Sequence, residues 1–354
     1  VIMENMETKV ERINREQMNM EIIREAGSIL KKGGLVAFPT ETVYGLGANA
    51  LDEKAAAKTY AAKGRPSDNP LIVHIARLED LYEVAEHVPE KAETLARKFW
   101  PGPLTMIFEK TSIVPYGTTG GLETVAVRMP DDEIARALIL AGGGYVSGPS
   151  ANTSGRPSPT TAGHVMDDLN GKIEMILDGG AVHIGVESTI VDMTSEPPMI
   201  LRPGAVTKEM LEKEIGQVLV DHAVLDADSK TPPKAPGMKY RHYAPKAELT
   251  VIEGELESVV STIQKMAGEK EEQGYRTGII ATEETVNRYS GSNIKCIGTR
   301  EDESTVAANL YGILREFDAD GTDYIYSESF DAEGIGSAVM NRLLKAAGHR
   351  VIKI

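Results

Sequence analysis

A proline-rich segment past the middle of the chain constrains the fold more than any other sequence feature. Residues 226–246, DADSKTPPKAPGMKYRHYAPK, contain four prolines and show no helical or strand periodicity of apolar residues. A stretch of this length without regular structure is unusual inside one compact domain, and such segments are often linkers or functional loops. The chain of 354 residues is long enough for two domains. We therefore expect a domain on each side of this segment, and we treat the segment as a candidate lid.

The residues before the linker have the pattern of a mixed α/β domain. Apolar residues at helical spacing predict a helix over 16–32, and the apolar run 35–38 predicts a buried strand directly after it. Similar strands and helices alternate up to about Val206, and a short helix follows at 208–215. The other predicted strands are 71–75, 104–108, 124–128, 145–147, 173–177 and 188–193, and the other predicted helices are 53–63, 78–86, 89–99 and 131–141.

The residues after the linker predict a smaller α/β domain. Strand-like runs alternate there with helical stretches, which is typical of a small parallel or mixed sheet covered by helices. The predicted strands are 250–252, 277–281, 294–297, 324–326 and 350–354, and the predicted helices are 256–273, 303–317 and 335–347. The predicted fold class is α/β (α+β), with an N-terminal extension over 1–14, a mixed-sheet domain over 15–206, a connecting segment and linker over 207–246, and a second domain over 247–354.

Charge and cysteine content argue against several classes of protein. The 38 Lys and Arg residues against 53 Asp and Glu give a formal net charge of -15 at pH 7, which opposes nonspecific attraction to nucleic acid or an anionic membrane. The single cysteine, Cys296, excludes an internal disulfide framework and a cysteine-rich zinc site. No signal peptide and no apolar run of about 18 residues is found. We expect a cytoplasmic enzyme that binds anions only in a locally cationic pocket.

Polar residues and glycines form four clusters in the predicted domain 15–206, and most of these clusters lie next to predicted strands. The ends of strands are where open α/β sheets commonly bind ligands. The clusters are PTETVYGLG at 39–47, KGRPSDNPL at 63–71, SGPSANTSGRPS at 147–158, and ESTIVD at 187–192 with LRPG at 201–204. Taken one at a time, most are explained about as well by a turn, and His74 is more often a core residue than a ligand.

Taken together, the clusters favour the binding of a nucleotide and a small polar substrate. Lys63, Arg65, Arg128 and Arg202 supply cations amid hydroxyl groups and glycines whose backbone N–H groups can surround an anion. No phosphate-loop motif, zinc-protease motif or nucleophile elbow occurs in the sequence. This combination predicts catalysis by positioning and charge stabilisation, without a covalent nucleophile.

In their order along the chain, PTETVYGLG, KGRPSDNPL, SANTSG, ESTIVD and LRPG resemble the YrdC-like domain of threonylcarbamoyl-AMP synthases. The K-x-R…S-x-N signature of that family is present as Lys63, Arg65, Ser150 and Asn152. The linker PGMKYRHYAPK and the α/β tail are similar to the long, two-domain version of the enzyme, so the resemblance covers nearly the whole chain. It implies a YrdC-like catalytic domain followed by a small Rossmann-like domain.

The resemblance also implies a reaction. A nucleotidyltransferase of this family condenses L-threonine, bicarbonate and ATP, with Mg2+, into threonylcarbamoyl-AMP and pyrophosphate. This is the first step of the threonylcarbamoyladenosine modification of tRNA. A separate transferase uses the product, so this chain need not bind tRNA itself.

The resemblance assigns roles to individual residues, whereas no metal ligand of the protein is predicted and the ligands of Mg2+ are left open. The catalytic residues would be Lys63 and Arg65, and the threonine site would comprise Thr42, His74, Arg128, Gly148 and Ser188. The ATP site would comprise Arg65, Asn69, Thr124, Ser150, Asn152, Ser158, Arg202 and, from the linker, Tyr243 in preference to Tyr240 or His242.

Two other functions are compatible with parts of the sequence. A non-catalytic RNA-binding or ribosome-maturation module could use the concave cationic surface that YrdC-like domains present, although the net charge of -15 opposes it. A carbamoyltransferase of the hydrogenase-maturation type also contains a YrdC-like domain, but its cysteine-rich zinc modules have no counterpart here. The oligomeric state, the role of the tail, the linker conformation and the downstream transferase are not predicted.

Overall fold

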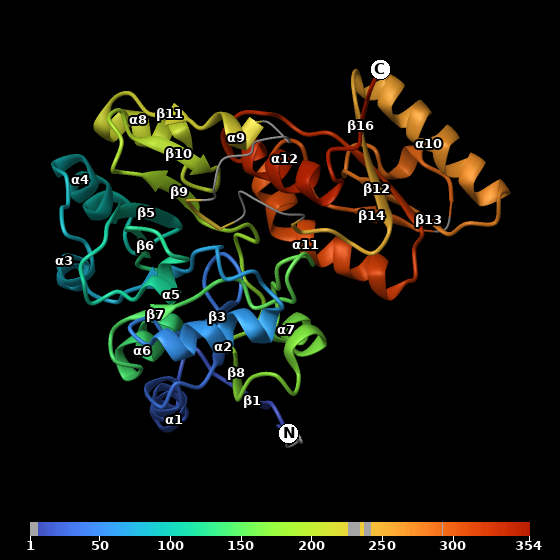
Figure 1. Ribbon diagram of the computed structural model, residues 1–354. Helices are drawn as coiled ribbons and strands as arrows, with labels where there is room; N and C mark the ends of the chain where they lie inside the picture. The colour runs from blue at the N-terminus through green and yellow to red at the C-terminus, as the bar shows by residue number, and fades with distance from the viewer. Residues whose placement is uncertain (1–5, 226–233, 237–241, 292) are drawn as a thin grey trace. The chain divides into compact units, whose positions relative to one another are not determined.

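The computed structural model describes residues 6–225, 234–236, 242–291 and 293–354, which divide into two compact units (Figure 1). The first unit comprises the chain up to residue 154 together with 158–183 and 187–239. The second comprises 240–354 and two short loops from earlier in the chain, 155–157 and 184–186. Among the described helices, none has the length and apolar character needed to cross a membrane.

A mixed sheet of 11 strands forms the centre of the first unit, in the order β1-β8-β2-β3-β7-β4-β6-β5-β9-β10-β11. Parallel and antiparallel pairs occur in the same sheet, as the sequence predicts for this domain. The strands are β1 (Lys9–Arg12), β2 (Val36–Phe38), β3 (Gly45–Asn49), β4 (Ile72–His74), β5 (Leu104–Glu109), β6 (Thr124–Arg128), β7 (Val146–Ser147), β8 (Met175–Asp178), β9 (Thr189–Asp192), β10 (Met199–Arg202) and β11 (Leu219–Val220).

Helices cover both faces of this sheet. Because side chains alternate along a strand, Val36 and Phe38 face α1 and α6, whereas Ala37 faces the opposite way, toward α7. The helices are α1 (Met20–Lys31), α2 (Glu53–Lys63), α3 (Leu81–Val84), α4 (Glu90–Phe99), α5 (Tyr116–Thr119), α6 (Glu133–Ala141), α7 (Ala162–Leu169), α8 (Lys208–Ile215) and α9 (His222–Leu225), with a 3-10 turn at Leu78–Asp80.

Several elements of the first unit differ from the sequence prediction. The predicted extension contains β1, which pairs with β8 although its four residues lack an apolar alternation. β3 lies in the motif PTETVYGLG, where the sequence predicts no strand, and its Gly45 and Gly47 leave room for the ring of Phe38 on the neighbouring strand. α7 was not predicted, and the helix expected over 78–86 is a 3-10 turn followed by the single turn α3.

The second unit is built on a parallel sheet of five strands in the order β14-β13-β15-β12-β16. Figure 1 shows α10 on one face of this sheet and α11 and α12 side by side on the other. The elements are β12 (Glu248–Glu253), α10 (Leu256–Glu272), β13 (Thr277–Ala281), β14 (Ile294–Cys296), α11 (Glu303–Ala319), β15 (Tyr324–Glu328), α12 (Gly334–Ala346) and β16 (Val351–Lys353), with a 3-10 turn at Val286–Arg288. The alternation of strands and helices predicted for the tail is therefore present.

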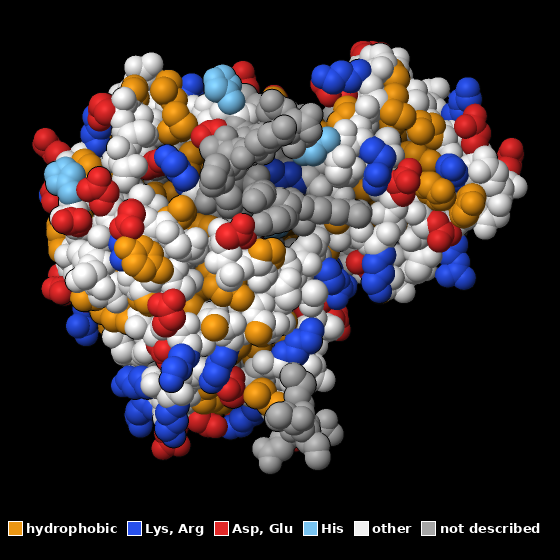
Figure 2. Space-filling view, in the orientation of Figure 1, with side chains coloured by type: hydrophobic (Ala, Val, Ile, Leu, Met, Phe, Trp, Pro, Cys, Tyr) orange, Lys and Arg blue, Asp and Glu red, His pale blue; other side chains and the backbone are white. Residues whose placement is uncertain are grey.

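The face of the molecule in Figure 2 carries acidic and basic side chains interspersed among polar and apolar ones. Both signs of charge are expected on the surface of a chain with 38 basic and 53 acidic residues.

The close packing of α1 on α6 gives a test of the fold. A Cβ atom on Gly27 would lie 2.5 Å from the backbone of Ala141, so Gly27→Ala should push the two helices apart. We expect this variant to lose about 1–3 kcal/mol of unfolding free energy, measured by urea denaturation.

Gly163→Ala is the matched control in α7, because a Cβ there would meet nothing nearer than Thr161 Oγ1 at 3.6 Å. This control should be neutral or gain up to about 1 kcal/mol from the better helix former. Equal stability of the two variants would contradict the close contact between α1 and α6.

Candidate functional site

Key residues of the predicted site share one face of the central sheet. β4 and β6 run side by side in the same direction, and His74 pairs with Arg128. β5 is antiparallel to β6, and its Thr105 lies opposite Arg128. The alternate residues Val73 and Val127 point to the other face, into the core that α4 covers. The polar face is therefore backed by a packed apolar layer.

Arg128 is a buried cation, 4% exposed, at the end of β6. Its Nη1 donates to Thr42 Oγ1 at 3.0 Å, its Nη2 forms an ion pair with Glu41, and its Nε donates to the carbonyl of Gly102. Glu41 also accepts a hydrogen bond from the backbone N–H of Asp131 at 3.2 Å. These contacts hold the planar guanidinium in one orientation, as the capture of a carboxylate by two parallel hydrogen bonds requires.

His74 is buried next to Arg128 and is held in place from two sides. Its Nδ1 lies 3.2 Å from the carbonyl oxygen of Ile72, and its ring meets that of Phe38 edge-on at 5.9 Å. Burial, with a smaller contribution from Arg128, lowers the pKa of His74 to about 3, so the imidazole is neutral at pH 7. Gly148 passes directly over it, because a Cβ there would lie 2.9 Å from the imidazole ring.

Ser188 connects the two predicted substrate sites. Its hydroxyl lies 2.7 Å from the hydroxyl of Thr105, which pairs with Arg128 across β5 and β6. Arg202 Nη2 donates to the same hydroxyl at 3.2 Å, and Arg202 Nε donates to the carbonyl of Ser188 at 3.0 Å. A residue assigned to threonine is thus in direct contact with a cation assigned to ATP.

Lys63 is the last residue of α2, and its ammonium group points into the loop after β7. It donates hydrogen bonds to the backbone carbonyls of Ser150 and Asn152, the latter at 2.7 Å. The same loop is hydrogen-bonded to the segment just before β3, because the N–H of Ala151 donates to the carbonyl of Tyr44 at 2.9 Å. Three of the four signature residues therefore meet here, and the contact of Lys63 with phosphate stays a prediction.

Arg65 and Asn69 lie before β4, away from the threonine residues. The guanidinium of Arg65 donates to the carbonyls of Asn69 and Pro70, the latter at 2.9 Å. The register of β4 and β6 places Pro70 level with Thr124, about 13 Å along the strand from Arg128 at ~3.3 Å per residue. The buried Oδ1 of Asn69 has no hydrogen-bond partner among the described residues. A hydrogen-bond donor of a bound ligand could satisfy this buried acceptor.

An apolar floor lies between these polar groups, and part of the linker covers it. The floor is formed by Ile72, Ile107, Ala126, Ile190 and Leu201. Ala235 of the linker packs into the same cluster and is fully buried. On either side of it, the carbonyl of Pro236 accepts from Arg202 at 3.4 Å, and Lys234 forms an ion pair with Asp192 at 3.4 Å. The described centre of the linker is therefore anchored on the face that carries the site.

Ser158 and Tyr243 complete the predicted set. The buried hydroxyl of Ser158 donates to the carboxylate of Glu187. Tyr243 belongs to the second unit, where it is buried and its ring lies 5.4 Å from that of Tyr311. Its contact with a nucleotide stays a prediction, and the alternative Tyr240 lies outside the described residues.

Three residues of the site were missed by the sequence analysis. Glu41 and Glu187 are buried carboxylates inside motifs that the analysis singled out for their hydroxyl groups. Thr105 is a fully buried hydroxyl in an apolar strand. A lone acidic or hydroxyl residue in a segment predicted to be buried was the available signal, because such a group needs a polar partner.

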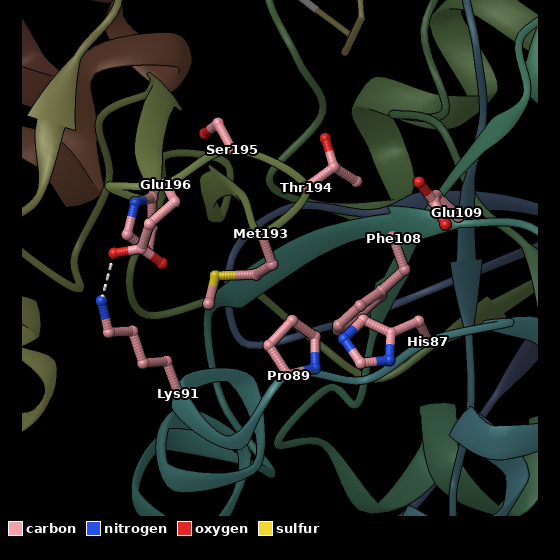
Figure 3. Close-up of a pocket in the computed structure, with 10 residues that line it drawn as sticks. His87, Pro89, Lys91, Phe108, Glu109, Met193, Thr194, Ser195 and Glu196 are labelled. Carbon is pink, nitrogen blue, oxygen red and sulfur yellow. Dashed lines mark hydrogen bonds and ion pairs between the residues drawn. The ribbon is translucent and has the colours of Figure 1, made fainter.

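A separate pocket of about 270 Å³ lies beside the β9–β10 connection and shares no lining residue with this site (Figure 3). An ion pair between Lys91 and Glu196 lies on one side of it, and His87 and Phe108 lie together on another. Within the described residues, no group of three or more His, Cys, Asp or Glu side chains could hold a metal ion.

Comparison with protein families matches both parts of the chain. Residues 28–204 match the Sua5/YciO/YrdC family, which is described as "Telomere recombination". Residues 206–348 match the family described as "Threonylcarbamoyl-AMP synthase, C-terminal domain". Together, the two matches account for nearly all of the described sequence.

Full-length relatives and a solved structure are also similar to this chain. The threonylcarbamoyl-AMP synthase of Pyrococcus abyssi is 49% identical over 96% of this chain and 98% of its own length. The synthase of Bacillus subtilis is 50% identical over 94% of each. The crystal structure of P. abyssi Sua5 complexed with L-threonine has a TM-score of 0.93 and 48% identity, and the match covers 98% of this chain and 100% of that chain.

The lowered pKa of His74 predicts a pH-dependent contribution to stability. Between pH 6.5 and about 3, the unfolded chain binds a proton at this residue that the folded chain does not. The stability that neutral His74 supports is therefore complete above pH 6.5, and it falls by up to about 1.4 kcal/mol per pH unit as the solution is acidified.

The measurement compares urea unfolding of the wild type and His74→Gln from pH 7 to pH 4.5. The advantage of the wild type should shrink as the pH falls, whereas His87→Gln, at an exposed histidine of the same unit, should follow the wild type. A difference between wild type and His74→Gln that is constant with pH would contradict the neutral, buried state.

Proposed function

The chain belongs to the Sua5/YciO/YrdC family, and on that premise we propose that it condenses L-threonine, bicarbonate and ATP into threonylcarbamoyl-AMP and pyrophosphate. One observation carries the proposal. The hydroxyl of Ser188 contacts Thr105 on one side and Arg202 on the other. Because Ser188 is assigned to the threonine site and Arg202 to the ATP site, the two proposed sites adjoin at this hydroxyl. Condensation of two substrates requires such a meeting point, since the reacting atoms have to approach within about 3–3.5 Å.

Threonine recognition would centre on Arg128. The guanidinium suits a bidentate contact with the threonine carboxylate, and burial strengthens its electrostatic attraction to that anion. Glu41 holds the guanidinium from one side without being a ligand itself. The neutral imidazole of His74 next to it adds no competing positive charge. The relative crystallised with L-threonine supports this assignment of the substrate.

The chemistry needs no nucleophile from the protein. The amino group of threonine combines with bicarbonate to give a carbamate and water. A carbamate oxygen then attacks the α-phosphorus of ATP, the bond between the α- and β-phosphates breaks, and pyrophosphate leaves. ATP enters as its magnesium complex, in which the phosphate oxygens hold the ion.

Lys63 and Arg65 would stabilise the charge that builds on the phosphates as pyrophosphate leaves. Both are buried, and both brace loops that carry other ATP residues. A fixed cation in a site closed to water lowers the energy of the transition state more than a solvated one, because it does not have to reorient during the reaction. The linker segment on the apolar floor supports a role for the linker in keeping water from the adenylate.

The adenylate is a mixed anhydride, and a separate transferase would pass its threonylcarbamoyl group to tRNA. A chain with a net charge of -15 and mixed surface charge (Figure 2) fits a protein that releases a small product. The cytoplasmic location belongs to the same proposal.

Pyrophosphate release tests the reaction directly. Purified protein should release pyrophosphate when ATP, Mg2+, bicarbonate and L-threonine are all present, because the attacking oxygen exists only on the threonine carbamate. Omission of threonine or of bicarbonate should reduce the rate to background. Release at the full rate without threonine would contradict the proposal.

Arg128→Lys and Arg65→Lys should separate the two substrates. Lysine retains the charge but loses the planar fork, so Arg128→Lys should raise the KM for threonine about tenfold or more, with a smaller change for ATP. Arg65→Lys should show the opposite preference. Each variant is the control of the other, and equal changes for both substrates in both variants would contradict the assignments.

A further inference from the structure

The second unit contains two buried arginines on the helices α11 and α12. Arg342 of α12 is completely buried and Arg315 of α11 is 6% exposed. We propose that these two arginines are positioning residues for the nucleotide: they fix the backbone of 155–157 and the ring of Tyr243, and thereby set the affinity for ATP. This inference rests on the proposed function, and it gives the tail domain a role in that function.

Arg315 acts on the loop that carries the predicted ATP residues. Its Nη2 donates a hydrogen bond of 2.7 Å to the carbonyl oxygen of Pro157. Pro157 directly precedes Ser158, and Ser150 and Asn152 lie a few residues earlier in the same loop. Any movement of the Pro157 backbone is therefore transmitted to Ser158 through a single peptide bond.

Arg342 acts on Tyr243. Its guanidinium carbon lies 5.9 Å from the centre of the tyrosine ring, within the range of a cation–π contact. The ring of Tyr311 lies 5.4 Å from the same ring, at an angle of 32°. The backbone of Tyr243 has a φ of 62°, which a residue with a large side chain adopts only when its surroundings hold it there. Both contacts thus restrain an unusual conformation.

The two restrained segments are also bonded to each other. The N–H of Ala244, directly after Tyr243, donates to the carbonyl of Gly155 at 2.9 Å. Asp318, one helical turn after Arg315 on α11, accepts from the N–H of Lys246 at 2.7 Å and pairs with Arg156 at 3.8 Å. The loop 155–157 and the end of the linker at 243–246 therefore form one hydrogen-bonded structure on α11.

A third segment approaches the same helix. A Cβ on Gly185 would lie 2.5 Å from the carbonyl oxygen of Ala307, so only glycine allows this approach. Two residues later, Glu187 accepts the hydrogen bond of Ser158. Both partners of that hydrogen bond are thus attached to segments held by α11.

A purely structural role would explain these arginines less well. A buried charge costs several kcal/mol unless it is compensated, and an apolar side chain of similar volume is often at least as stabilising. The neighbouring α11 positions Leu310, Leu314 and Phe317 are apolar and fully buried, as expected for such a core. Arg315 donates to a loop carbonyl, and the guanidinium of Arg342, which also donates to Asn341 Oδ1 at 3.0 Å, lies within cation–π range of an aromatic ring. Both arginines are therefore suited to holding those groups in place.

The experiment measures the KM for ATP, the KM for threonine and kcat of the full-length protein in the pyrophosphate assay. Arg315→Met should raise the KM for ATP about tenfold through loss of a charge-assisted hydrogen bond, while the KM for threonine changes less than about twofold. Arg342→Met should show the same preference, and Arg315→Lys, which keeps the positive charge and can still donate to the Pro157 carbonyl, should recover part of the affinity. Arg288→Ala removes an exposed pair with Glu257 in the same unit and should leave all three values unchanged.

Two further readouts separate this inference from the proposed function. Hydrogen exchange of the backbone around 154–158 should be faster in Arg315→Met than in the wild type, and the dissociation constant for a non-hydrolysable ATP analogue should rise by the same factor as the KM. If the wild type releases no pyrophosphate, the proposed function fails, and these two readouts still test the positioning. Unchanged exchange and unchanged ATP affinity in folded Arg315→Met and Arg315→Lys, or equal losses for ATP and threonine, would overturn the inference.

Discussion

The organisation of the first unit depends on the burial of one guanidinium. Arg128 ends β6 in an environment that excludes most water, and an uncompensated charge there would cost several kcal/mol. Its partners come from the β2–β3 connection, through Glu41 and Thr42, and from Gly102 before β5. These contacts draw two loops from distant parts of the chain to the end of β6. The site is therefore a consequence of how the fold compensates a charge that it has to bury.

Local sequence patterns predict the elements of this fold where the pattern is uninterrupted. The strand predicted at 124–128 is observed as Thr124–Arg128, and the helix predicted near 53–63 is observed as Glu53–Lys63, where Asp52 and Gly64 cap its two ends. β1 and β3 cannot be predicted in this way. β1 carries exposed charges and forms a strand because it pairs with β8, and β3 contains glycines that lie close to the neighbouring strand. Tertiary packing decides such segments.

In the candidate site, too, local sequence patterns predict only part of what the structure shows. Motif order indicates which residues serve each substrate, but not which of them touch. That Ser188 joins Thr105 to Arg202 follows from the pairing of β5 with β9 and of β9 with β10, which no local pattern specifies. Glu41 and Glu187 were missed because burial distinguishes them from the many exposed glutamates, and burial is a property of the fold.

The division of the chain into units has a consequence for how such a protein can be taken apart. Segments 155–157 and 184–186 precede the linker in sequence but belong to the second unit, so the two units are interleaved along the chain. After cleavage within the linker, these two loops would belong to the first fragment, whereas α11 and Arg315, which they contact, would belong to the second. The covalent boundary and the structural boundary therefore do not coincide, and modules defined by the linker alone would each be incomplete.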